Sequence, residues 1–256
     1  MKNRLLLLPI FLAIAFTNSS YQKKITAKEK TGTLKITFIN TVKGNPLQLN
    51  EASYTNPFAE QYTVSKFKYY VSNIAVAFPD GILTEKESYH LIDESKPESL
   101  SFSFYASVNT YHSLLFMLGV DSIKNVSGAQ TGALDPLNDM FWTWNTGYVM
   151  AKMEGNSPQS TIVNSKVEFH IGGFSGADNV LKKLKLNFPA GQALEIRESK
   201  TSEIVIEADL DKWWQDPNDL KIANNALCTT PGSLAKKIAD NYSKMFSIKN
   251  ITNNQN

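Results

Sequence analysis

FKYYVSNIAVAF, residues 67–78, is the stretch that decides the fold class of this chain. Side chains of a β-strand point alternately to its two faces, so apolar residues at every second position predict a half-buried strand. The apolar positions fall into two groups, which are Phe67, Tyr69 and Val71, then Ile74, Val76 and Phe78. The second group is out of phase with the first, and the change falls at Ser72–Asn73. One extra residue there predicts a β-bulge that redirects a long strand.

The same alternation recurs along the chain in short segments separated by turn-forming residues. The clearest of these segments are LKITFIN (34–40), LSFSFYA (100–106) and VEFHIGG (167–173). No helical periodicity lies between the main strands, which argues against a parallel α/β sheet. The pattern predicts a mainly β protein, an antiparallel β-sandwich or barrel-like single domain.

One helix is predicted near the C-terminus. SLAKKIADNYSKMF (233–246) carries apolar side chains at helical spacing and follows Pro231 and Gly232. No linker interrupts residues 33–248, so we expect them to form the whole β domain. The last residues, 249–256, are polar and are expected to be a flexible tail.

The N-terminus has the composition of a secretory signal peptide over residues 1–20. Lys2 and Arg4 precede an apolar run, Leu5 to Phe16, that is shorter than the roughly 20 residues of a transmembrane helix. No cysteine follows this run, so a lipoprotein anchor is not expected, and no other stretch predicts a transmembrane segment. Residues 21–32 are expected to be a flexible lead-in. The predicted location is therefore periplasmic or secreted.

The charge balance bears on the partners that the chain can bind. It has 26 Lys and Arg residues against 24 Asp and Glu residues. Removal of residues 1–20 takes away two basic residues and no acidic ones, which leaves a formal net charge of zero. Nucleic-acid binding needs a basic face, so a nucleic-acid partner is not expected.

Enzyme motifs do not occur in this sequence. It has no phosphate loop, no dinucleotide-binding fingerprint, and no HExxH, GxSxG or CxxCH element. We therefore expect a binding protein without catalysis of its own.

A long connection and the aromatic segment after it are the candidate functional regions of the chain. Residues 121–140 have no sustained periodicity, and loops of this length in a compact domain are often functional. They lead into MFWTWNTGY, where alternation places Trp142 and Trp144 on one face of a predicted strand. Large aromatic side chains in such a position usually fill a core.

Several side chains could hold a metal ion. His170 is the strongest candidate, because alternation places it opposite the apolar face of its strand and two glycines follow it. His90 and His112 are weaker candidates. The single cysteine, Cys228, forms no internal disulfide and is either a buried apolar residue or a ligand. A Cu(I) site would also accept the thioether of Met140, Met150 or Met153.

Calcium is a competing possibility for the long connection. Calcium prefers oxygen ligands, although no EF-hand spacing is present. The candidate oxygen ligands are Asp121, Asn125, Asp135, Asn138 and Asp139.

The ordered motifs of the chain resemble those of a known family. FKYYVSNI, YHLID, GVDS, GALDPLNDMFWTWNTGY, KMEG and FHIGG occur in this order and are similar to segments of the MbnP-like copper-binding proteins. The resemblance covers most of residues 33–248 and is most specific around Trp142 and Trp144.

This resemblance implies an exported bacterial protein of copper homeostasis. Some members are encoded beside a di-haem enzyme related to MauG and cytochrome c peroxidase, which oxidises a tryptophan to kynurenine, and the modified protein binds copper. Carried over, the tryptophan is Trp142 or Trp144, and His170 is the metal ligand. The chain departs from other exported copper proteins with kynurenine, which have a histidine two residues from the modified tryptophan. Here Met140 and Trp144 stand at that spacing from Trp142, and Trp142 and Thr146 stand at that spacing from Trp144.

Two other functions remain open at this stage. The first is a surface-located structural or ligand-binding β-sandwich without metal, whose aromatic cluster contacts a carbohydrate or a protein. The second is an enzyme, which ranks last because no acid–base or nucleophile arrangement is found.

Overall fold

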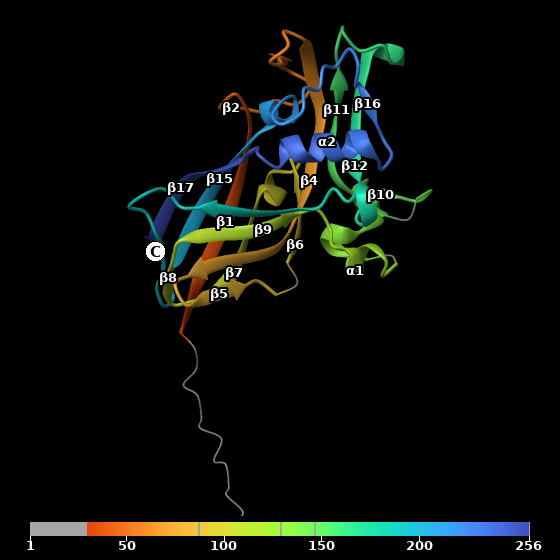
Figure 1. Ribbon diagram of the computed structural model, residues 1–256. Coiled ribbons are helices and arrows are strands. Elements are labelled where there is room, and N and C mark those ends of the chain that lie inside the picture. Colours follow the sequence, from red (N-terminus) through yellow and green to blue (C-terminus); the bar gives the residue numbers. More distant parts are fainter. Residues whose placement is uncertain (1–29, 87, 129, 146, 256) are drawn as a thin grey trace, which may run out of the picture.

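A computed structural model describes residues 30–86, 88–128, 130–145 and 147–255. Two β-sheets form most of the molecule (Figure 1). The strands of the smaller sheet are, in spatial order, β17 (Phe246–Gln255), β15 (Thr201–Asp209), β1 (Thr31–Val42) and β2 (Asn45–Pro46), with β7 (Ser101–Ser107) also paired to β1.

The larger sheet is built around one long strand, β4 (Gln61–Phe78). Its spatial order is β13 (Lys182–Asn187), β9 (Ser113–Leu118), β4, β11 (Gly147–Asn156), β12 (Lys166–Gly172) and β16 (Leu227–Cys228). The strands that pair outside this order are β3 (Ser53–Thr55), β5 (Gly81–Thr84) and β6 (Tyr89–Asp93) on β4, and β10 (Phe141–Trp142) on β11. A separate ribbon joins β8 (Asn109–Tyr111) to β14 (Leu194–Ile196).

Short helices connect these strands. The α-helices are α1 (Ser122–Asn125) and α2 (Ser233–Tyr242). The 3-10 helices are η1 (Pro97–Leu100), η2 (Gly132–Leu134), η3 (Pro136–Asn138), η4 (Val163–Ser165), η5 (Gly176–Asp178) and η6 (Leu210–Trp213). Helix α2 lies across the larger sheet near β12 (Figure 1). No helix in the described part of the chain is both long and apolar enough to span a membrane.

The core lies between the two sheets and is rich in aromatic rings. Phe38 of β1 contacts Tyr69 of β4 and Phe116 of β9, with ring centroids 6.0 and 6.4 Å apart. Phe116 in turn packs on Phe246 of β17 at 5.3 Å. These contacts join the facing surfaces of both sheets, so the prediction of a mainly β-sandwich domain with a C-terminal helix is confirmed.

The predicted bulge in β4 is also confirmed. The register with β9 shifts between Ser72 and Ala75, and Asn73 has a left-handed backbone with φ of 52°. The extra residue changes the phase of the strand, so that Ile74 and Val76 are as fully buried as Phe67 is before it.

Two expectations about the ends of the domain were wrong. Residues 249–255 are not a flexible tail, because they belong to β17, which pairs with β15 along its length. The backbone groups at the edge of β15 need hydrogen-bond partners, and the backbone of β17 supplies them regardless of its polar side chains. Ile248 and Ile251 of β17 also pack against the core. The helix ends at Tyr242, one turn before the expected residue 246, because β17 begins at Phe246.

The expected lead-in, residues 21–32, is wrong at its end, because β1 already begins at Thr31, and its residues 21–29 lie outside the described residues. The predicted signal peptide, residues 1–20, lies outside the described residues.

Candidate metal centre and aromatic cleft

The candidate metal centre lies on the outer face of the β11–β12 pair. In β12, Phe169 and Ile171 point into the core, so Glu168 and His170 point outward. The antiparallel register places Glu154 of β11 directly opposite Glu168, and Lys152 opposite His170. The ligand atoms of Glu154, Glu168 and His170 all lie within 4.8 Å of one another. Two carboxylates and an imidazole therefore converge on one partly buried spot.

Glu154 is held ionised by its neighbours. His170 Nε2 lies 2.9 Å from Glu154 Oε1, and Lys66 Nζ lies 3.2 Å from Glu154 Oε2. The hydrogen bond from His170, helped by the charge of Lys66 and opposed by partial burial, lowers the pKa of Glu154 to about 2. A carboxylate that is already ionised at neutral pH can accept a cation without losing a proton.

A loop residue neutralises the lysines beside this centre. Asp139 follows η3, and its carboxylate lies 3.3 Å from Lys66 Nζ and 3.0 Å from Lys152 Nζ. Partial burial raises the pKa of Asp139, but the two lysines outweigh that effect and hold it below its ordinary value. Lys152 is only 3% exposed and also donates to the carbonyl oxygen of Asp139. Its ammonium group is thus paired with Asp139 of the loop.

Further hydrogen bonds fix the long connection on this face of the sheet. Tyr70 of β4 donates to the carbonyl oxygen of Ala133, and Tyr148 of β11 donates to that of Leu134, over 2.9 and 2.7 Å. The segment that leads to the tryptophans is therefore positioned by the sheet beneath it.

The two tryptophans have different environments. Strand β10 contains only Phe141 and Trp142, and a turn follows before β11 begins. Trp142 is 6% exposed, whereas Trp144 is 62% exposed, and their ring centroids are 5.4 Å apart. The expectation that one strand carries both rings into the core was wrong, because the turn releases Trp144 to solvent.

Trp142 lies beside the strand that carries His170. A Cβ atom added to Gly172 would come within 2.4 Å of the Trp142 ring, so the ring rests directly on this glycine. His170 and Gly172 are two residues apart on the same face of β12, a spacing of about 7 Å. The tertiary structure thus brings a histidine near Trp142, although the sequence places none two residues away.

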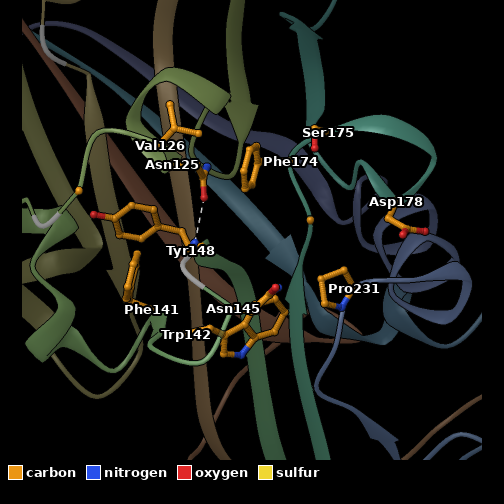
Figure 2. Close-up of a pocket in the computed structure, with 13 residues that line it drawn as sticks. Asn125, Val126, Phe141, Trp142, Asn145, Tyr148, Phe174, Ser175, Asp178 and Pro231 are labelled. Carbon is orange, nitrogen blue, oxygen red and sulfur yellow. Dashed lines mark hydrogen bonds between the residues drawn. The ribbon is translucent and has the colours of Figure 1, made fainter.

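A cleft opens beside Trp142. Its volume is about 750 Å³, and Figure 2 shows the rings of Phe141, Trp142, Tyr148 and Phe174 along it. Asp178 lies across the cleft from Phe141 and Tyr148 (Figure 2). The Asn125 side chain accepts a hydrogen bond of 2.9 Å from the backbone N–H of Tyr148, which ties α1 to the start of β11.

The other histidines are not part of this centre. His90 lies on β6, which is separated from β12 by β4 and β11, a distance of about 14 Å. Its ring stacks on Phe102 at 3.5 Å, and its Nε2 lies 2.9 Å from Glu85. His112 is exposed in the break between β8 and β9.

The sulfur-containing candidates are buried and are not among the converging ligand atoms. Met140, Met150 and Met153 belong to the hydrophobic core and are at most 1% exposed. Cys228 is buried, and burial raises the pKa of its thiol to about 11. A thiol of this kind is protonated at neutral pH and is a poor ligand.

The calcium prediction for the long connection finds no support. Asp121 caps α1 and accepts a hydrogen bond from the hydroxyl of Tyr89. Asp135 caps η3, and the amide of Asn138 donates to the carbonyl oxygens of Gly132 and Ala133. Asn125 and Asp139 have the partners given above. Each of these side chains caps a helix or binds its own partner, and they do not form a shared set of ligands.

Glu154 and Glu168 are the site residues that sequence reasoning missed. Alternation in β12 already predicts that Glu168 and His170 share one face, but Glu168 was not predicted as a ligand. Glu154 is separated from them in sequence, and only the register of β11 against β12 brings it there.

The fold and this centre define a β-sandwich protein with a candidate nitrogen–oxygen metal site on an open sheet face. The model of the MbnP family matches residues 31–232, so the chain belongs to the MbnP family. Among solved structures, MbnP from Methylosinus trichosporium is similar, with 13% sequence identity and a TM-score of 0.47. That alignment covers 86% of this chain and 98% of the other. No curated protein matches the chain.

Proposed function

We propose that this protein is an exported copper-binding protein that holds Cu(II) with Glu154, Glu168 and His170. The observation that carries the proposal is the convergence of three ligand atoms within 4.8 Å of one another. Imidazole and carboxylate ligands suit Cu(II), and copper is the divalent metal that nitrogen–oxygen sites bind most tightly in the first row. Membership of the MbnP family supports copper as the metal, as the sequence resemblance implies.

The structure favours Cu(II) over Cu(I) for this centre. Soft thioether and thiolate ligands select Cu(I), but the candidate methionines and Cys228 are buried, and the ligand atoms that converge are two carboxylates and an imidazole. On binding, the metal would replace the hydrogen bond between His170 and Glu154, while Lys66 can stay on the second oxygen of Glu154. The role is binding, with no reaction catalysed by the chain itself.

Metal titration tests this function. Purified protein should bind one Cu(II) per chain in competition with a chromophoric chelator, and its electron paramagnetic resonance spectrum should show one nitrogen ligand. Zn(II) should bind more weakly and Mg(II) not measurably, as the order of divalent-metal affinities requires. Absence of stoichiometric Cu(II) binding, or a spectrum without nitrogen coupling, would contradict the proposal.

We further propose that a di-haem enzyme of the MauG and cytochrome c peroxidase group oxidises one tryptophan of the Trp142–Trp144 pair to kynurenine. Trp144 is accessible to a partner, and its ring lies next to that of Trp142. Trp142 in turn rests on Gly172, close to the proposed copper ligand His170. Oxidation would thus occur beside the metal centre and could change its ligands.

Mass spectrometry of protein from the native host tests the modification. With peroxide or dioxygen as the oxidant, two oxygen atoms open the indole ring, and hydrolysis then releases one carbon as formate. The net loss of one carbon and gain of one oxygen raise the mass by about 4 Da. The peptide containing Trp142 and Trp144 should show this rise. The buried pair Trp213 and Trp214 serves as an internal control and should be unchanged. An unmodified first peptide, or an equal change in both, would refute the proposal.

A further inference from the structure

We infer that the cleft beside Trp142 binds an organic cation, namely an ammonium or guanidinium group carried on an apolar body. This site is distinct from the metal centre, because none of Glu154, Glu168 and His170 lines it. Its volume of about 750 Å³ falls in the range of about 300–1,000 Å³ that is usual for small-molecule sites.

Aromatic rings supply the first part of the recognition. Phe141, Trp142, Tyr148 and Phe174 come from three separate segments and line the same cleft (Figure 2). The face of an aromatic ring carries partial negative charge and therefore attracts a cation. This attraction does not depend on the direction of the cation's N–H bonds. Several rings around one cleft also bury the apolar body of a ligand.

Their positions are set by the backbone. Phe141 and Tyr148 are register partners in the β10–β11 hairpin, and their rings meet edge to face at 5.1 Å. Phe174 follows Gly173, which has a φ of 124°, a conformation that favours glycine. A Cβ atom at Gly173 would also clash with the carbonyl oxygen of Asp178. The loop after β12 therefore turns back on itself and carries both a ring and a carboxylate to the cleft.

Charge supplies the second part. Among the described residues that line the cleft, Asp178 is the only charged one. Two lysines of neighbouring segments are directed elsewhere. Lys124 lies over the Tyr89 ring at 5.7 Å and contacts Gln130, and Lys182 forms an ion pair with Asp240. The described lining of the cleft therefore combines one carboxylate and four aromatic rings with no basic side chain, which favours a cation over an anion.

A matched set of probes tests this inference on the metal-free protein. 2-Phenylethylammonium, 2-phenylethanol and phenylacetate share one aromatic ring and differ in charge. Nuclear magnetic resonance titration should show the ammonium binding about 5- to 30-fold more tightly than the alcohol, the range expected for a cation held over rings and beside one carboxylate. Phenylacetate should bind most weakly. Shifts should map to Phe141, Trp142 and Phe174.

A second arm identifies the source of the cation. The tripeptide acetyl-Gly-Arg-Gly-amide presents a guanidinium group as a protein partner would. Binding of the tripeptide in preference to the amine indicates a side chain of a partner protein, and the reverse preference indicates a free amine. Either outcome supports a cation site.

Variants separate this site from a general aromatic surface. Asp178→Asn should remove the preference for the ammonium over the alcohol, whereas Asp80→Asn, at an exposed position in the β4–β5 turn, should leave it intact. Three outcomes would overturn the inference. They are equal affinity for the ammonium and the alcohol, no binding of any probe at about 10 mM, and an unchanged preference in Asp178→Asn. Cu(II) binding by Asp178→Asn should match the unmodified protein, so the two proposals can fail independently.

Discussion

Replacement of His170 by alanine is expected to weaken Cu(II) binding by at least about 100-fold, because loss of a ligand should exceed the 10- to 100-fold cost of losing a residue that merely supports one. The imidazole is the one nitrogen donor among the three converging side chains. The remaining carboxylates, Glu154 and Glu168, could still attract the ion but would hold it loosely. The nitrogen coupling in the electron paramagnetic resonance spectrum should disappear together with the affinity.

His112→Ala is the matched control for this experiment. It removes the same side chain from an exposed position in the break between two strands, away from the cluster. Its Cu(II) affinity and spectrum should equal those of the unmodified protein. Glu168→Gln should give an intermediate loss, since it removes one charged ligand and leaves the His170–Glu154 pair intact. Equal copper affinity in His170→Ala and His112→Ala would show that the centre lies elsewhere.

Gly172→Ala is expected to destabilise the fold by about 1–3 kcal/mol, the usual cost of forcing extra atoms into a packed site. The new Cβ would lie 2.4 and 2.6 Å from two ring carbons of Trp142 and 3.0 Å from the carbonyl oxygen of Tyr148. Because a carbonyl cannot move without disturbing β11, the ring must leave its place. Urea denaturation should report the loss of stability, and the indole N–H resonance of Trp142 should shift.

Gly147→Ala provides the comparison at a neighbouring glycine. Gly147 is the register partner of Trp142, and an added Cβ there would meet its nearest atoms at 3.6 Å, an ordinary contact. Its free energy of unfolding should change by less than about 1 kcal/mol, since removal of glycine also restricts the unfolded chain. If both variants lose the same stability, the ring of Trp142 does not depend on the bare backbone at Gly172.

The local sequence was enough for much of the architecture. Alternation predicted the strands around Phe67 and Phe169, and the phase change predicted the bulge at Asn73, because side-chain direction in a strand depends on position along the chain alone. The same reasoning placed His170 on an outer face. It failed for the C-terminal residues, where Ile248 and Ile251 are separated by polar positions and the strand forms because β15 offers an open edge.

Sequence by itself thus determined the fold class, the outward direction of His170 and, through the ordered motifs, the resemblance to the MbnP family. Only the tertiary structure decided which side chains join His170 and how the two tryptophans differ. Glu154 reaches the centre through strand register, and Trp142 reaches Gly172 through the turn that exposes Trp144. Register and turn geometry arise from contacts between segments distant in sequence, which no local pattern encodes.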